Sequence, residues 1–161
     1  MEIEKDKIIY RRAKLDDIEI LVDYRVRLLN EVFNHQENEE TETLKKELLE
    51  YFSKSIHSKD FIIWLAEYNG KVIGISGIVV WEMPPWYECK SGRLGYIFNT
   101  YTIPEARGKG VCTRLLSELI KEAELLGLTY LHVYSSDDAI SIYRKAGFVE
   151  PSLIELELRL E

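Results

Sequence analysis

The sequence is poor in cysteine, histidine and apolar runs, and each shortage excludes a class of protein. Its 161 residues include only two cysteines, Cys89 and Cys112, too few for the disulfide framework of a small secreted domain. The three histidines, His35, His57 and His132, lack the spacing of metal ligands, so we expect no metal site. No apolar run approaches the ~20 residues of a membrane-spanning helix, and the charged N-terminus lacks the apolar core of a signal peptide. We therefore expect a cytoplasmic, reduced protein with no membrane partner.

Positively charged residues are also fewer than negatively charged ones. The chain has 21 Lys and Arg residues against 28 Asp and Glu residues, a net charge of −7. This balance argues against nucleic-acid binding, which needs a basic face, and is compatible with a cationic partner. The length, 46% hydrophobic residues and 30% charged residues are typical of one soluble globular domain, which we place at residues 1–161.

A glycine-rich turn between a strand and a helix is the most informative feature that is present. Residues 95–103 form an apolar, strand-like run that ends at Pro104, and the turn follows as Ala-Arg-Gly-Lys-Gly-Val-Cys-Thr at residues 106–113. Val111, Leu115 and Leu119 then recur at the spacing of an amphipathic helix, which Gly127 is expected to end.

This order of elements has a chemical meaning. The first backbone N–H groups of a helix lack intrahelical partners and lie at the positive end of the helix dipole. Glycine lets a backbone approach a bulky anion, and Arg107 and Lys109 add positive charge at the same place. The turn therefore suits a phosphate or pyrophosphate. An ordinary turn with two solvated basic residues is an equally good interpretation of the loop alone.

Two familiar phosphate-binding patterns do not fit the turn. Lys109 is followed by Gly110, where a P-loop needs Ser or Thr. Thr113 stands where the dinucleotide-binding fingerprint has its third glycine.

A third pattern does fit. Arg107-x-x-Gly110-x-Cys112 resembles the acyl-CoA pyrophosphate loop of the GNAT acetyltransferase superfamily, [Gln/Arg]-x-x-Gly-x-[Gly/Ala]. Residues 96–105 resemble that family's strand before the loop, and residues 139–148 resemble its later helix-turn motif ending Tyr-x-x-x-Gly-Phe. The sequence departs at Cys112, but cysteine is also small, so the backbone contact should survive.

The resemblance implies a fold and an activity. The fold would be α/β, with a mixed, mostly antiparallel central sheet flanked by helices on both faces. The activity would be N-acetyltransfer from acetyl-CoA, without a metal, to a primary amine of a small molecule or protein by direct attack. A non-catalytic acyl-CoA-binding sensor module is the alternative, and a homodimer is left open.

The resemblance also implies roles for individual residues. Tyr143 matches the family's general acid, although an aromatic packing residue is the alternative. Glu82, at the end of a strand, is our candidate for the general base, and Glu31 is a second one. The cofactor-binding residues would be Asn99, Tyr101, Thr102 and Ile103 along the strand, Arg107, Gly108, Lys109, Gly110, Val111, Cys112 and Thr113 in the turn, and Ser136 near the later helix.

The remaining elements follow from periodicity and turn signals. We expect helices from about Asp16 or Asp17 and over 41–54, with Thr41 as the N-cap of the second, and a third helix that residues 135–138 cap. We expect strands over 8–12, 61–67, 72–81, 130–134 and 154–160, with a hairpin turn at 69–70. In the resembling family the first two helices form one wall of the acceptor site, so these side chains could touch substrate or could simply be core: Tyr24, Glu31, Phe33, His35 and Tyr51. The loop over 82–91 could be a lid or a subunit contact.

Overall fold

A computed structural model describes residues 3–160, which form a five-stranded sheet in the order β1-β2-β3-β4-β5. The strands are β1 (Ile9–Arg12), β2 (Phe61–Tyr68), β3 (Lys71–Glu82), β4 (Arg93–Thr102) and β5 (Leu131–Val133). The first four pair antiparallel, and β5 pairs parallel to β4 through the crossover helix α3 (Val111–Leu125). This arrangement confirms the predicted mixed, mostly antiparallel sheet.

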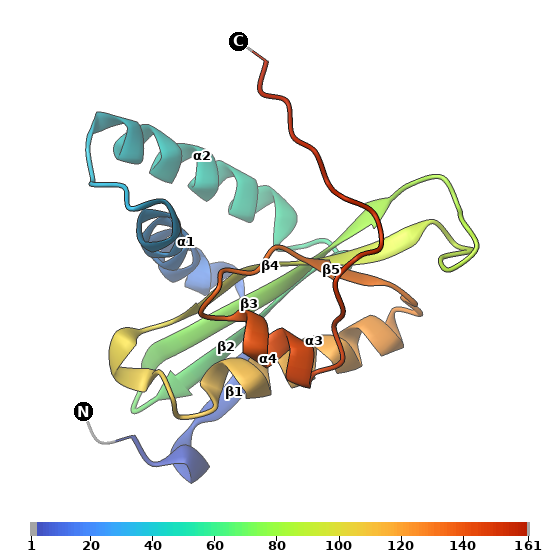
Figure 1. The fold of residues 1–161 in the computed structure, drawn as a ribbon. Helices are drawn as coiled ribbons and strands as arrows, with labels where there is room; N and C mark the ends of the chain where they lie inside the picture. The colour runs from blue at the N-terminus through green and yellow to red at the C-terminus, as the bar shows by residue number, and fades with distance from the viewer. Residues whose placement is uncertain (1–2, 161) are drawn as a thin grey trace.

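Helices cover both faces of the sheet (Figure 1). The helices α1 (Ile18–Phe33) and α2 (Glu39–Ser55) lie on one face, where Leu21 and Phe52 pack on Ile63 and Leu65 of β2. The helices α3 and α4 (Ile140–Lys145) lie on the other face. Three short 3-10 turns complete the order of elements: Lys5–Lys7, Leu15–Asp17 and Pro104–Ala106.

The side chains of α3 and α4 fill the second core. Leu116 and Leu119 of α3 pack with Tyr143 of α4 on Ile78 and Ile97 of the sheet. The spacing of these leucines places them on one side of the helix, as the apolar periodicity predicted.

Several local predictions are confirmed. Asn69 and Gly70 both have positive φ, 51° and 73°, as a tight two-residue hairpin between β2 and β3 requires. Gly127 follows α3 with a φ of 68°. Gly147 follows α4 with a φ of 99°, and the N–H of Phe148 donates to the carbonyl of Tyr143.

A bulge in β4 positions the site. Ile75 pairs with Tyr101 and Gly77 pairs with Phe98, so Ser76 alone stands opposite two residues, Asn99 and Thr100. Asn99 has a φ of 55°, in the left-handed region. The pairing of β4 with β5 ends at Ile97, while β4 continues to Thr102. The two parallel strands therefore part beside the bulge.

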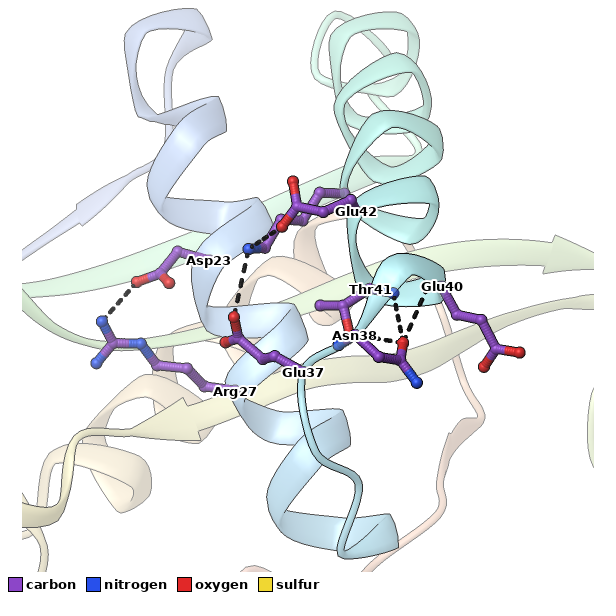
Figure 2. Close-up of polar contacts among 8 residues, drawn as sticks. Asp23, Arg27, Glu37, Asn38, Glu40, Thr41 and Glu42 are labelled. Carbon is purple, nitrogen blue, oxygen red and sulfur yellow. Dashed lines mark hydrogen bonds and ion pairs between the residues drawn. The ribbon is translucent and has the colours of Figure 1, made fainter.

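Three sequence predictions were wrong. The alternating residues 154–160 are not a strand, because alternation needs a neighbouring backbone to pair with, and this segment runs as an extended chain that is not part of the five-stranded sheet (Figure 1). Asn38, not Thr41, is the N-cap of α2: its Oδ1 accepts from the amides of Glu40 and Thr41, and Thr41 completes a capping box (Figure 2). The N-cap of α4 is Ala139, and no side chain of residues 135–138 caps it.

Candidate active site

A cavity of about 760 Å³ opens beside the β4 bulge. Four segments wall it: the C-terminal half of α1, the end of β4, the glycine-rich turn with the start of α3, and the residues leading into α4. Its lining residues are Leu28, Glu31, Val32, Thr100, Tyr101, Thr102, Ala106, Arg107, Gly108, Gly110, Val111, Cys112, Thr113, Ser136, Asp138, Ala139 and Ile142.

The glycine-rich turn leaves the N-terminus of α3 open to this cavity. Gly108 and Gly110 have φ values of 72° and 85°, and a Cβ built at either position would meet no heavy atom within 4 Å. Gly110 is the N-cap of α3, no side chain caps the helix, and its first turn contains no acidic residue. The unpaired amides therefore keep their capacity for an anion.

Arg107 is held at the cavity edge by three contacts. Its Nε donates to the carbonyl of Thr102 at 2.9 Å, and its Nη2 lies 2.6 Å from Oε2 of Glu31. Its guanidinium carbon lies 5.7 Å from the centre of the Tyr101 ring. The hydroxyl of Tyr101 donates to the other Glu31 oxygen at 2.9 Å. A cation is thus fixed beside the open helix end.

Buried polar atoms without partners lie along the bulge. Both side-chain heteroatoms of Asn99, a residue only 1% exposed, lack a hydrogen-bond partner among residues 3–160, and so does Oγ1 of Thr102. Leaving such groups unpaired costs about 1–3 kcal/mol each. Hydrogen-bonding groups of an extended ligand lying along β4 would remove that cost.

Tyr143 lies behind the cavity wall, and its ring packs edge-on to Phe148 with the ring centres 5.6 Å apart. Its hydroxyl shares a hydrogen bond with Thr100, which lines the cavity. Burial raises the pKa of Tyr143 to about 12, although the bond from Thr100 acts in the opposite direction. The phenol is therefore protonated at neutral pH and can donate a proton.

The cysteine of the turn is not set up as a nucleophile. Burial raises the pKa of the Cys112 thiol to about 11, so its thiolate is rare at neutral pH. Cys89 is also free of a disulfide and is buried.

The structure brings most of the predicted cofactor residues together. Those that line the cavity are Tyr101, Thr102, Arg107, Gly108, Gly110, Val111, Cys112, Thr113 and Ser136. Asn99 lies in the adjoining bulge, Ile103 packs into the cores on both faces, and Lys109 lies in the turn outside the lining. No group of three or more His, Cys, Asp or Glu side chains within residues 3–160 could hold a metal ion.

The two candidate bases occupy different places. Glu31 lines the cavity but is bound by Tyr101 and Arg107. Glu82 lies at the last position of β3, with its side chain 80% exposed and 4.0 Å from Arg93. Because neighbouring side chains of a strand point to opposite faces, Glu82 also faces away from its neighbour Trp81. The geometry gives the assignment of Glu82 no support.

The predicted acceptor residues of α1 and α2 differ in their exposure. Tyr24 is core, with its hydroxyl donating to the carbonyl of Val72, whereas Phe33 and Tyr51 are exposed. Phe33 and His35 line a second hollow between the two helices, of about 380 Å³.

Sequence reasoning missed several residues at the site. Leu28 and Val32 of α1 line the cavity, and Asp138, Ala139 and Ile142 close it from the other side. Tyr96, which stacks on Trp81 with ring centres 4.4 Å apart, lies close enough to Tyr143 to affect its pKa. Apolar periodicity marked Leu28 and Val32 only as core, and Asp138 was predicted only as a capping residue of the later helix.

Comparisons with known proteins agree with this geometry. A family model described as the acetyltransferase (GNAT) family matches residues 26–148. A search of curated proteins found no match. Within residues 3–160, no helix is long and apolar enough to cross a bilayer.

Solved structures with the same fold include acetyltransferases. A predicted acetyltransferase from Clostridium acetobutylicum, solved with acetyl-CoA, is 32% identical over 93% of this chain and 96% of that one, with a TM-score of 0.84. A GCN5-related N-acetyltransferase from Ralstonia eutropha JMP134 is 18% identical over 94% and 98% of the two chains, with a TM-score of 0.83. Glucosamine-6-phosphate N-acetyltransferase from Arabidopsis thaliana is 16% identical over 94% and 97%, with a TM-score of 0.65. The family match, together with the first of these relatives, shows that this chain belongs to the GNAT acetyltransferase family.

Proposed function

We propose that the protein transfers the acetyl group of acetyl-CoA to a primary amine. One observation carries the proposal: a single cavity runs from the uncapped N-terminus of α3 to the end of β4, with the unpaired polar groups of Asn99 in the adjoining bulge and the buried, protonated phenol of Tyr143 behind its wall. The helix N-terminus suits the anionic end of the donor, and the bulge suits its amide-bearing arm. The phenol suits the leaving thiolate.

The turn would hold the pyrophosphate. The amides of Val111, Cys112 and Thr113 point out of the first turn of α3, and Arg107 supplies a fixed positive charge. Gly108 and Gly110 let the backbone come close, and Lys109 of the same turn adds a positive charge.

The pantetheine arm would lie along β4, where the strand parts from β5. Asn99 and Thr102 have buried polar atoms that need partners, and Tyr101 forms part of the wall. Ser136 lines the opposite side and offers a hydroxyl. The 32% identical relative solved with acetyl-CoA supports this choice of donor.

Tyr143 would act as the general acid. The reaction breaks the carbon–sulfur bond of the thioester as the amine nitrogen bonds to the carbonyl carbon. The departing thiolate takes a proton, and the buried Tyr143 hydroxyl, linked to Thr100 at the cavity wall, holds one at neutral pH.

Solvent would remove the proton of the amine. Glu82 is exposed and paired with Arg93, and Glu31 is occupied by Tyr101 and Arg107. We therefore propose a water-mediated route in place of the predicted base Glu82.

Thiol release from acetyl-CoA, measured against a panel of primary amines, tests the proposal. The expected result is release that depends on the amine, with the N-acetylated product identified by mass spectrometry. Tight acetyl-CoA binding with no turnover across a broad panel would instead support the alternative of an acyl-CoA sensor.

A further inference from the structure

One arginine near the site has no counter-charge. Among residues 3–160, only Arg25 and Arg159 form no ion pair, and Arg159 is exposed in the C-terminal segment. The paired arginines are Arg11, Arg12, Arg27, Arg93, Arg107, Arg114 and Arg144. Arg25 is half-buried, and no carboxylate of the described residues lies within ion-pair distance of it. Arg11 and Arg93 are also half-buried, but each has a carboxylate partner, whereas Arg25 has none.

The position of Arg25 on α1 places it next to residues that line the cavity, although Arg25 itself does not line it. Residues at i, i+3 and i+7 share a helix face, so Arg25 lies on the same face as Leu28 and Val32, which line the cavity. Glu31 binds Arg107 at the pyrophosphate end. Arg25 lies six residues earlier, about 9 Å along the helix axis from Glu31. It is therefore displaced from the pyrophosphate loop, toward the other end of the site.

Aromatic side chains surround that end. Tyr96 of β4 and Tyr51 of α2 lie close enough to raise the pKa of Arg25, which burial lowers more strongly. Tyr96 in turn stacks on Trp81 and packs edge-on to Tyr134 with ring centres 5.8 Å apart. Tyr96 also lies close enough to Tyr143, the proposed acid, to raise its pKa.

A carboxylate already lies at the edge of this aromatic cluster. Glu155, in the segment after α4, accepts a hydrogen bond from the hydroxyl of Tyr134 and acts on the pKa of Tyr96. It makes no ion pair with Arg25. The carboxylate of Glu155 thus lies beside Tyr134 and Tyr96 without pairing with Arg25, so the Arg25 guanidinium remains available to another anion.

We propose that Arg25 binds a carboxylate or phosphate carried by the amine acceptor, which makes the substrate an anionic primary amine. This inference rests on the proposed acetyl transfer to amines. Even a half-buried charge without a partner carries a desolvation cost, and a planar guanidinium fits either oxyanion with two parallel hydrogen bonds. The net charge of −7 repels such acceptors in general, so a local cation is what would admit them.

The test compares matched acceptors with and without the anion. Glycine and β-alanine are compared with their amides in a carboxylate arm, and O-phosphoethanolamine with ethanolamine in a phosphate arm. The wild-type protein should prefer the anionic member of at least one arm. Arg25→Gln should lower kcat/KM for that member by about 10- to 100-fold, mostly through KM, and leave the neutral member unchanged. Because each variant is compared with wild type on the same amine, differences in intrinsic reactivity between amines do not affect the result.

Two further variants separate binding from structure. Arg27→Gln, on the same helix, removes an arginine that is already paired with Asp23 at 3.0 Å and should leave both members of each arm unchanged (Figure 2). Arg25→Lys keeps the charge without the planar fork and should lie between wild type and Arg25→Gln. The melting temperature of Arg25→Gln should stay level or rise, because an unpaired charge is removed.

The outcomes are distinguishable. No thiol release by the wild-type protein with any amine would refute the proposed function, and this inference with it. Thiol release that is equal for charged and neutral members, or equally selective in wild type and Arg25→Gln, would refute only the role of Arg25. A marked fall in the melting temperature of Arg25→Gln would assign Arg25 to the fold instead.

Discussion

The hydroxyl of Tyr143 is the atom on which the proposed proton transfer depends. Tyr143→Phe keeps the ring and its packing on Phe148 but removes the proton donor. A positioned acid contributes about 10²–10⁴-fold, so we expect kcat to fall within that range while acetyl-CoA affinity and melting temperature change little. Thiol-release kinetics, calorimetric titration and thermal unfolding measure the three quantities. Full turnover in this variant, under conditions where chemistry limits the rate, would make Tyr143 a packing residue.

For the carboxylate of Glu82, also a single residue, we expect the opposite outcome: its removal should change activity little. Its side chain is exposed and its contact with Arg93 is long, at 4.0 Å. Glu82→Gln should therefore change kcat/KM less than about threefold across the pH range of activity, because surface ion pairs contribute little. If the variant instead lost an acidic limb of the pH–rate profile together with most of its turnover, Glu82 would be the base after all.

At the level of elements, the open N-terminus of α3 predicts where CoA binds. Gly110→Asp places a carboxylate where the pyrophosphate would lie, and repulsion adds to the bulk of the side chain. We expect the Kd for CoA to rise about tenfold or more, measured by calorimetry on the folded variant.

The other end of α3 supplies a matched control for that substitution. Gly127 has a similar left-handed φ of 68° and open space around a built Cβ. Gly127→Asp therefore introduces the same charge and the same backbone strain away from the cavity, and CoA affinity should be unchanged. An equal loss of affinity in both variants would point to strain in the helix rather than to the anion site.

At the level of the whole molecule, one buried carboxylate ties three elements together. Glu122 of α3, whose side chain is 6% exposed, accepts from Arg12 of β1 at 2.6 Å and from Trp64 of β2 at 3.0 Å. Burial raises the pKa of Glu122, but the bonds from Arg12 and Trp64 outweigh it and leave the pKa below its usual value. The charged form therefore stabilises the fold.

This linkage predicts a pH-dependent effect of Glu122→Gln. A carboxyl whose pKa is lower in the folded state contributes stability above its unfolded pKa of about 4.3, and loses it as the pH falls through the folded value. We expect the variant to be about 1–2 kcal/mol less stable than wild type in urea unfolding at pH 7. The difference should shrink toward zero in acid. Glu124→Gln, exposed on the same helix, should show no difference at either pH.

Much of the fold was predictable from the sequence, because it depends on short-range preferences. Asn69-Gly70 predicts a hairpin wherever it occurs between two strand-like runs, and the period of Leu115 and Leu119 predicts the buried side of α3. The turn at 106–113 combines local signals with a family motif, so most of its residues line the cavity as expected. Each of these features depends on residues that are close to one another in the sequence.

The tertiary structure alone decided which side chains meet. The strand predicted at 154–160 has the right alternation but no partner backbone, and the alternation cannot supply one. Glu82 and Arg25 are both ordinary charged residues in the sequence, yet packing leaves one exposed beside Arg93 and the other half-buried without a carboxylate. The free energy of a charge depends on its burial and its partners, and both come from elements distant in the chain.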